Sequence, residues 1–420
     1  MLSMNVLEKR ILDSIDAHEV SQLTCELVAV PSHSGHEVEA QKFIANKLHS
    51  IGLEVDTWNI DFEELKKHYD FSMSIDRHEG LGVVGGYGSG AKSLILCGHI
   101  DTVDIGDPEK WDTNPLKATI RGDRLYGLGT CDMKGGLASA LTAVKALIDA
   151  GVELDGRLIY ESCIGEEDGG CGALAACLRG YKGDAGIVME PTECKVAPEV
   201  GGAVSFKVTI LGRSAHACIR EEGESAIEKF VTILNGLKEL EAERNIRMSS
   251  QLFRRYRLPY ALNVGIIQGG RWPGTVPDEV CFEARMGVGV GEEITHAKAE
   301  LEKRLKEVSE SDPWLRDHPP KVEWSGYRFA SSRIDSNHPI VETLAQSYID
   351  VTGFEPSFEG MPYASDARLL INVGGTPTVV FGPGDVRDAH RPNESVSLAA
   401  LETSSKTIAL TILRFLGSKN

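Results

Sequence analysis

Apolar residues in the first half of the chain alternate between helical and strand-like patterns. Residues 36–51 have helical spacing, with Ile44 and Leu48 on one face, Ser34 as the expected N-cap and Gly52 as the stop. The other elements predicted here are strands at 81–87, 93–99, 157–165 and 185–190 and a helix at 134–150. Strands that alternate with helices predict an α/β fold built in layers.

The pattern changes near residue 201. Residues 203–211 alternate apolar and polar positions, which is typical of an antiparallel strand with one exposed face. The next predicted elements are a helix at 224–243, strands at 261–268 and 280–288 and a helix at 292–309. The α/β pattern then returns, with a helix after His338, a strand at 376–382 and a final helix at 397–416.

These changes divide the chain into a large domain and an insertion. A chain of 420 residues is longer than the ~250–300 residues at which single cores stop growing, so two domains are expected. We predict a large α/β/α domain formed by residues 1–200 and 325–420, interrupted by a smaller α+β domain at 201–324. Segment 62–80 shows no clear periodicity and is expected to be an added surface element.

Charge and composition argue against several classes of function. The net charge of −18 disfavours a nucleic-acid partner, because surfaces that bind nucleic acid are usually basic. The N-terminal residues carry charges where a signal peptide needs an apolar core, and no apolar run approaches the ~20 residues that cross a bilayer. Nine cysteines occur without a C-x-x-C pair, which is typical of reduced thiols. We therefore expect a cytoplasmic protein that binds neither a membrane nor nucleic acid.

Five potential metal ligands occur at the ends of predicted strands or in turns of one α/β unit: His99, Asp132, Glu167, Glu190 and His390. Open α/β sheets place their ligands at strand ends. Each residue alone has an ordinary explanation, since Asp132 can cap the following helix and a loop histidine is usually solvated. As a set, histidines and carboxylates suit zinc, with cobalt or manganese as substitutes. Two metals that share a carboxylate would polarise a carbonyl and generate hydroxide at neutral pH.

Two further carboxylates accompany these ligands. Asp101 follows His99 by two residues and can accept the second N–H of that ring, which would orient it. Glu166 and Glu167 are adjacent, and a cation would relieve their repulsion. One of them can therefore bind metal while the other stays free as a base.

The motifs of the chain resemble a known family. The segments LCGHIDTV, YGLGTCDMKGG, GEED, MEPT, GRSAHA and AHRPNE match, in this order, the metal-dependent deacylases and peptidases, over about residues 20–416. That family includes acetylornithine deacetylase, succinyl-diaminopimelate desuccinylase, aminoacylase and glutamate-releasing carboxypeptidases, and the chain is most similar to the first two. The resemblance implies an amidohydrolase with two divalent metal ions, most readily zinc. It implies a small N-acyl amino acid or related amine as the substrate.

The resemblance also assigns roles to the residues of the large domain. One metal would be held by His99, Asp132 and Glu190, and the other by Asp132, Glu167 and His390. Glu166 would be the general base, and Asp101 would orient His99.

In the inserted domain, the resemblance implies a lid and a dimerisation surface, and hence a homodimer. His216 in GRSAHA matches a residue that helps to stabilise the oxyanion from the neighbouring subunit. Asn263 matches a further polar contact at that site. Arg285 matches the arginine that binds a substrate carboxylate.

Two departures leave the substrate open. Leu128 stands where the family often has arginine between two glycines, and Cys131 is unusual so close to the metals. An N-formyl-aminopyrimidine deformylase, another small-amide hydrolase, or a metallo-dipeptidase or carboxypeptidase is the alternative within the family.

Two further alternatives lie outside the family. A cysteine amidase would use Cys97, Cys131 or Cys163, but no pairing with a histidine is evident. A nucleotide-binding loop at 85–90 would need G-x-G-x-x-G followed by a helix, and neither is present, so we predict a turn.

Overall fold

The chain forms two compact units, seen here in a computed structural model that describes residues 4–247 and 250–419. The large unit comprises residues 1–200, 332–360 and 365–420, and the small unit comprises residues 201–331 and 361–364. The small unit continues past the boundary expected at residue 324. Its last strand, β13 (Arg328–Phe329), pairs with β9 (Gly202–Leu211) of the same unit, which explains the extension.

A nine-stranded mixed sheet forms the centre of the large unit. Its strands, in order across the sheet, are β1 (Glu54–Asn59), β2 (Leu81–Tyr87), β6 (Arg157–Cys163), β3 (Ser93–His99), β7 (Ala185–Val188), β16 (Thr378–Val380), β8 (Val196–Val200) and β14 (Ser332–Arg333), with β15 (Phe358–Met361) paired to β8. The central strands β6, β3, β7 and β16 run parallel to one another. Their carboxyl ends therefore lie along one edge of the sheet, where ligands bind in folds of this kind.

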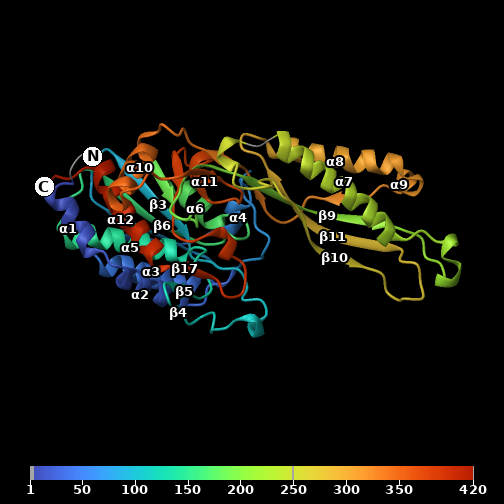
Figure 1. The fold of residues 1–420 in the computed structure, drawn as a ribbon, viewed down its shortest axis with the longest axis horizontal. Coiled ribbons are helices and arrows are strands. Elements are labelled where there is room, and N and C mark those ends of the chain that lie inside the picture. The colour runs from blue at the N-terminus through green and yellow to red at the C-terminus, as the bar shows by residue number, and fades with distance from the viewer. Residues whose placement is uncertain (1–3, 248–249, 420) are drawn as a thin grey trace. The chain divides into compact units, whose positions relative to one another are not determined.

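Helices cover both faces of this sheet, as Figure 1 shows. One layer contains α2 (Ala17–Val28), α3 (Val38–Ser50), α5 (Lys134–Asp149) and α12 (Leu398–Leu416). The other contains α6 (Cys171–Arg179) and α11 (Ala367–Asn372). The hydroxyl of Tyr160, on one face of β6, donates to the carbonyl oxygen of Leu137 in α5. Glu161 and Cys163 lie on the opposite face of β6, toward α6. The α/β/α architecture predicted for the large domain is confirmed.

Helices α1 (Val6–Ser14) and α10 (Pro339–Thr352) pack against α12, and α4 (Phe62–Leu65) is a single turn. A small sheet of β4 (Thr119–Arg121), β5 (Arg124–Tyr126) and β17 (Ser395–Ser397) supports the loop that precedes α5. No helix in the described ranges is both long and apolar enough to span a membrane.

The start of α3 differs from the sequence prediction. The helix begins at Val38 with Glu37 in the N-cap position and no side-chain cap, so Ser34 is not the cap. The backbone N–H of Ser34 instead donates to the carbonyl of Thr102, beside the end of β3. Ser34 is therefore held next to the candidate site by a contact between distant parts of the chain.

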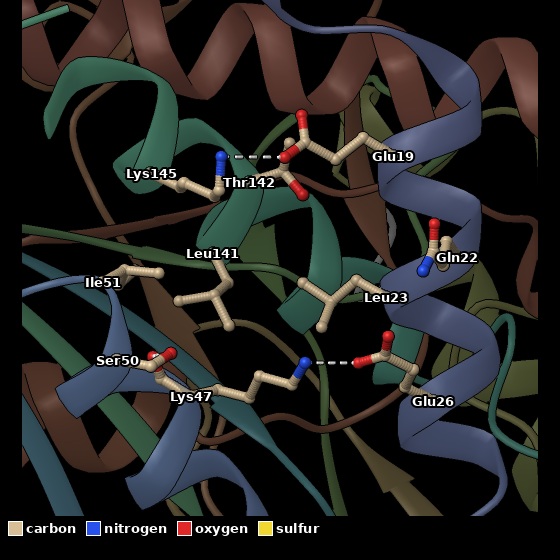
Figure 2. Close-up of a pocket in the computed structure, with 10 residues that line it drawn as sticks. All are labelled: Glu19, Gln22, Leu23, Glu26, Lys47, Ser50, Ile51, Leu141, Thr142 and Lys145. Atoms are coloured by element: carbon tan, nitrogen blue, oxygen red, sulfur yellow. Dashed lines mark hydrogen bonds and ion pairs between the residues drawn. The ribbon is translucent and has the colours of Figure 1, made fainter. Parts of the chain in front are cut away.

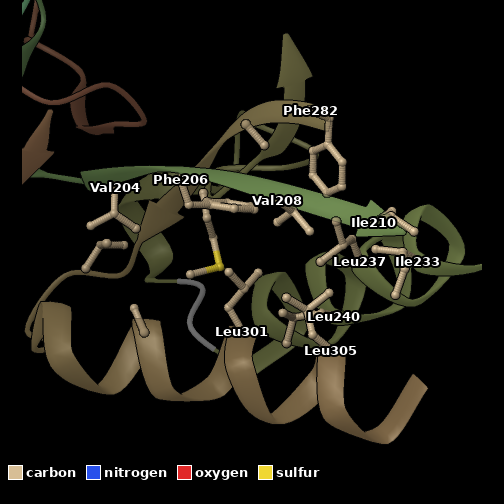
Figure 3. Close-up of a cluster of buried hydrophobic side chains, with 14 of the residues drawn as sticks. Val204, Phe206, Val208, Ile210, Ile233, Leu237, Leu240, Phe282, Leu301 and Leu305 are labelled. Carbon is tan, nitrogen blue, oxygen red and sulfur yellow. The ribbon is translucent and has the colours of Figure 1, made fainter. Parts of the chain in front are cut away.

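The small unit is an antiparallel sheet covered on one face by helices. Its strands are β10 (Leu262–Gly269), β11 (Glu279–Val288), β9, β12 (Lys321–Glu323) and β13, and its helices are α7 (Ala226–Arg247), α8 (Ile294–Ser311) and α9 (Pro313–Asp317). Alternate residues of β9 and β11, such as Phe206 and Phe282, pack against Leu237, Leu240 and Leu301 of the two long helices (Figure 3). The opposite face of this sheet carries the intervening, more polar residues.

Candidate metal centre

Three of the predicted ligands meet at the carboxyl edge of the large sheet. His99 is the last residue of β3, Glu190 follows β7, and Asp132 precedes α5. The Nε2 atom of His99 lies 3.2 Å from Oδ1 of Asp132 and 3.8 Å from Oε2 of Glu190. His99 and Glu190 are buried, and the three side chains form a group that could hold one metal ion.

The remaining two predicted ligands join Asp132 in a second group. Nε2 of His390 lies 2.9 Å from Oε1 of Glu167 and 3.4 Å from Oδ2 of Asp132. Asp132 thus directs one oxygen to each histidine and belongs to both groups. This arrangement is what a carboxylate that bridges two cations requires.

The charges of these five groups depend on one another. Burial opposes protonation of His390, but its hydrogen bonds to Asp132 and Glu167 outweigh burial and raise its pKa to about 11. Burial opposes the charge on Asp132, yet hydrogen bonds from both histidines hold its pKa below the usual range. Burial raises the pKa of Glu190 to about 8, offset only in part by His99. Three carboxylates and two imidazoles crowded in this way fit divalent cations, which would replace the protons that otherwise neutralise them.

Glu166 differs from its neighbour Glu167 in having no ligand-like contact. Its carboxylate is buried, with 7% of the residue exposed, and among the described residues it has no hydrogen-bond partner. Burial and the nearby Glu190 raise its pKa well above the usual range. A carboxyl group of raised pKa that faces a cation site and binds nothing else is suited to proton transfer.

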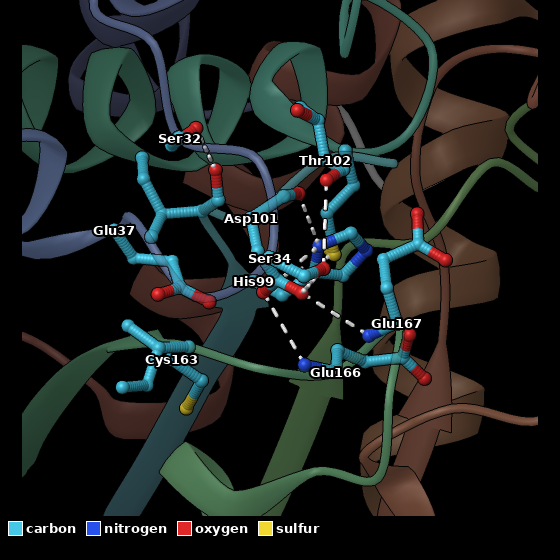
Figure 4. Close-up of polar contacts among 12 residues, drawn as sticks. Ser32, Ser34, Glu37, His99, Asp101, Thr102, Cys163, Glu166 and Glu167 are labelled. Carbon is cyan, nitrogen blue, oxygen red and sulfur yellow. Dashed lines mark hydrogen bonds and ion pairs between the residues drawn. The ribbon is translucent and has the colours of Figure 1, made fainter. Parts of the chain in front are cut away.

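Asp101 contacts His99 through its backbone carbonyl oxygen and not, as the sequence suggested, through its carboxylate. Nδ1 of His99 lies 2.9 Å from the backbone carbonyl oxygen of Asp101, while the nearer carboxylate oxygen is 3.6 Å away. The carboxylate instead accepts the backbone N–H groups of Glu166 and Glu167, at 3.3 and 3.1 Å (Figure 4). Asp101 therefore fixes the histidine through its main chain and the two glutamates through its side chain.

Glu394 is a positioning residue to which the sequence reasoning gave no role, although it ends the motif AHRPNE. Its buried carboxylate accepts the backbone N–H groups of Gly129, Cys131 and Asp132 at 2.8–3.0 Å. These bonds fix the turn that presents Asp132 to both histidines. The side chain of Cys131 is turned away, toward the carbonyl of Asp385 at 3.2 Å.

Segment 62–80, which we expected to be a surface element, also contributes a buried arginine that supports the loop of Glu166 and Glu167. Arg77 is 4% exposed and pairs with Asp168 and with Glu37, each at 2.6 Å. Asp168 directly follows Glu167 and also accepts the N–H of Ile75 at 2.9 Å. The segment thereby holds the loop that carries the two glutamates. No local sequence signal marks this contact, because its partners are distant in the chain.

The other three candidate residues lie in the small unit. His216 is exposed at the start of a 3₁₀ turn, and its Nδ1 accepts the N–H of Cys218 at 3.2 Å, so the neutral ring carries its proton on Nε2. Asn263 of β10 and Arg285 of β11 are directly paired in register, on the face opposite the apolar cluster. Within the described ranges, the Arg285 guanidinium has no ion-pair partner.

The two readings from outside the family find no support. Cys97, Cys131 and Cys163 are all buried, and none hydrogen-bonds a histidine in the described part of the chain. Burial raises the pKa of Cys131 well above its usual value, which suppresses the thiolate. The glycine-rich stretch at 85–90 is the end of β2 and a turn into β3, with no helix after it.

A pocket of about 270 Å³ lies elsewhere in the large unit, between α2, α3 and α5 (Figure 2). Ion pairs from Lys47 to Glu26 and from Lys145 to Glu19 border it. It contains none of the candidate metal ligands, so it is not part of the site described above.

The fold and the site together define a metal-dependent hydrolase: two overlapping groups of nitrogen and oxygen donors beside an unpaired, buried carboxylate. Residues 95–414 match the family described as Peptidase family M20/M25/M40. The chain belongs to this family and is an amidohydrolase.

Relatives of several specificities span almost the whole chain. An N-formyl-4-amino-5-aminomethyl-2-methylpyrimidine deformylase of Halalkalibacterium halodurans is 31% identical over 97% of each chain. An acetylornithine deacetylase of Photorhabdus laumondii is 27% identical over 95% of this chain and 98% of its own length.

Solved structures show the same fold. The di-peptidase Dug1p of Saccharomyces cerevisiae has a TM-score of 0.76 at 17% identity, covering 99% of this chain and 98% of that one. A Bacillus subtilis protein described as a dinuclear metal-binding peptidase has a TM-score of 0.63 at 17% identity, covering 95% and 98%.

Proposed function

We propose that this amidohydrolase removes a short acyl group from a small amine, with N-formyl amines as the first substrates to test. The observation that carries the reaction class is the unpaired, buried Glu166 beside two donor groups that share Asp132. The N-formyl preference rests on the relatives: the deformylases of Halalkalibacterium halodurans and Bacillus subtilis are 31% and 30% identical, against 27% for the acetylornithine deacetylase.

We assign one divalent ion to His99, Asp132 and Glu190, and a second to Asp132, Glu167 and His390. The nitrogen and oxygen donors suit zinc, with cobalt and manganese as working substitutes. Bound cations at these groups would polarise the amide carbonyl and make a water molecule more acidic.

Glu166 performs the proton transfers. Its carboxylate accepts a proton from the attacking water and donates it to the leaving nitrogen, so that the amine departs neutral. The raised pKa of Glu166 suits the second step, because the group must hold the proton until the leaving nitrogen accepts it. Asp101 keeps the backbone of Glu166 in place through its carboxylate.

A second candidate substrate class is an N-acetyl amino acid, which the unpaired Arg285 favours. A guanidinium binds a carboxylate through two parallel hydrogen bonds, and an arginine already paired within the protein would not be available. Asn263 is its direct neighbour across the strands and can add an amide contact to the same group.

We further propose a homodimer in which His216 reaches the site of the partner subunit, with the small unit as lid and dimerisation surface. The protonated Nε2 of the exposed ring is a donor for the oxyanion that forms when water attacks the carbonyl. The cytoplasm remains our expectation for its location, and all nine cysteines are free thiols.

A hydrolysis panel tests this proposal. N-formyl-aminopyrimidine, N-acetylornithine, N-succinyl-diaminopimelate and simple dipeptides are compared on protein loaded with zinc, cobalt or manganese. We expect the highest kcat/KM for the N-formyl amine. A higher value for N-acetylornithine, together with a large rise in KM in Arg285→Lys, would favour the second class. Protein that holds two ions per subunit and cleaves none of these amides would overturn the proposal.

A further inference from the structure

Three side chains behind the metal centre form a separate group of possible ligands. Cys97 lies on β3, and Glu161 and Cys163 lie on the adjacent parallel strand β6. Cys97 pairs in register with Glu161, and Cys163 pairs with His99, so all three side chains share the face of the sheet that α6 covers. One ligand atom from each lies within 4.8 Å of the others.

The carboxylate of Glu161 is buried beside the Cys97 thiol, and among the described residues it has no cationic partner. Glu161 is 1% exposed, and neither of its oxygens accepts a hydrogen bond that meets ordinary geometry from the described residues. No lysine or arginine of residues 4–247 and 250–419 forms an ion pair with it. Burial and the neighbouring carboxylate of Asp366, which accepts no hydrogen bond from the described residues, raise the pKa of Glu161 to about 8, and the Cys97 thiol offsets this only in part. A buried carboxylate of this kind is costly unless something neutralises it.

The spacing of the two sulfurs fits a tetrahedral ion. The Sγ atoms of Cys97 and Cys163 are 3.7 Å apart, far beyond a disulfide bond. Two sulfurs bound to one tetrahedral zinc at about 2.3 Å lie about 3.8 Å from each other. Cys97 and Cys163 are 0% and 3% exposed, so the strands already hold the sulfurs at this separation inside the protein.

We infer that Cys97, Cys163 and Glu161 form a third cation site, for a thiophilic divalent ion such as zinc or cobalt. On binding, the two thiol protons and the proton that the Glu161 carboxyl holds at neutral pH leave to solvent, and two thiolates and one carboxylate surround the ion with a net charge of −1. The ion would join β3 to β6 directly below His99 and the loop of Glu166. The site is independent of the proposed reaction. Its sulfur donors distinguish it from the catalytic groups, which contain only nitrogen and oxygen (Figure 4 shows the Cys163 sulfur apart from the two glutamates).

Cobalt reports this site directly, because bonds from thiolate to Co²⁺ absorb in the near ultraviolet and bonds to nitrogen or oxygen do not. The full chain is stripped with chelator and titrated with Co²⁺ under a reductant that contains no thiol. We expect three ions per subunit and a near-ultraviolet band that accompanies one of them. Cys97→Ser and Cys163→Ser should each lose the band and one ion, while keeping the other two.

Matched variants locate the thiolates. Cys177→Ser, at a buried cysteine of α6, and Cys131→Ser, beside Asp132, should both keep the band. Should the two cysteine variants of the site fail to fold, Glu161→Gln, which is nearly isosteric, should weaken binding of the band-forming ion at least tenfold. The inference is overturned by saturation at two ions without a band in the wild-type protein. It is equally overturned by a band that Cys131→Ser abolishes and Cys97→Ser retains.

Discussion

Asp101 holds the ring of His99 through its backbone carbonyl oxygen, 2.9 Å from Nδ1, and not through its carboxylate. One residue thus supports the metal centre in two separate ways. The main chain fixes the orientation of a ligand, and the side chain fixes the loop of the general base. The two contributions can be tested apart, because a substitution at Asp101 changes only the side chain.

Asp101→Asn should lower kcat by ~10–100-fold, the usual cost of losing a supporting contact around a metal site. The amide can accept from only one of the two N–H groups of Glu166 and Glu167, and its own NH₂ faces the other. The carbonyl that holds His99 remains, so metal content should stay near normal. Metal analysis alongside steady-state kinetics checks this. A fall in metal affinity as large as the fall in kcat would instead indicate that the Asp101 carboxylate orients His99, as the sequence suggested.

Glu166→Gln and Glu167→Gln should both lose activity but should differ in metal content. Glu166→Gln removes the proton carrier and should lower kcat by ~10²–10⁴-fold with both metals retained. Glu167→Gln removes the charge of one of the two carboxylate partners of His390, and should reduce metal content at that group together with activity. Elemental analysis of both purified variants gives the answer. Full activity in Glu166→Gln would show that Glu166 does not transfer the proton.

Chelator-stripped protein should lose stability as pH rises from about 5 to 8. The folded-state pKa of Glu190 is raised to about 8 and that of His390 to about 11, while unfolded glutamate and histidine titrate near ~4.3 and ~6.5. The folded chain therefore binds more protons than the unfolded chain across this range, and its free energy of unfolding falls with pH.

Metal loading should produce the opposite trend, because cations compete with those protons and bind more tightly at higher pH. Thermal unfolding of stripped and loaded protein at pH 5, 6, 7 and 8 measures both effects. The gap in Tm between the two forms should widen with pH. A stripped protein whose Tm rises over this interval would show that Glu190 and His390 do not dominate.

Arg77→Met should destabilise the fold by ~3–5 kcal/mol, because it leaves the buried carboxylates of Glu37 and Asp168 without their shared cation. Arg220→Met is the matched control: its pair with Glu228 is exposed, and such pairs are worth ~0–1 kcal/mol. Denaturant unfolding compares the two variants. Equal, small losses in the free energy of unfolding of both variants would show that the pairs of Arg77 with Glu37 and Asp168 do not stabilise the loop of Glu166 and Glu167.

The sequence predicted the elements whose signal is local. The strands at 81–87 and 93–99 have the bounds expected, because each is a continuous apolar run bounded by polar or glycine residues. The five proposed metal ligands could be chosen because they follow such strands or turns in order along the chain. What it could not reveal were contacts between distant segments. Arg77 lies 91 residues from Asp168, and Glu394 lies 262 from Asp132, and no periodicity links such pairs.

The prediction for His216 tests whether two subunits build one site. An exposed histidine in a turn is ordinarily a solvated residue, and its role here rests on the motif GRSAHA and on the proton carried by Nε2. Losing a donor to the oxyanion typically costs ~10²–10³-fold in kcat. His216→Ala should show a loss of this size with its metals and its oligomeric state unchanged.

Mixing His216→Ala with Glu166→Gln under conditions that exchange subunits then separates action within a subunit from action between subunits. If His216 serves the partner, one site of the mixed dimer lacks both groups. The other has the intact Glu166 of the first chain and the intact His216 of the second. Activity should therefore rise above that of either variant alone, toward half of the wild-type value in each mixed dimer. If His216 served its own subunit, every site in the mixture would lack one group. Labelled subunits must show that exchange has occurred, and exchange without recovered activity would exclude the partner as the source of His216.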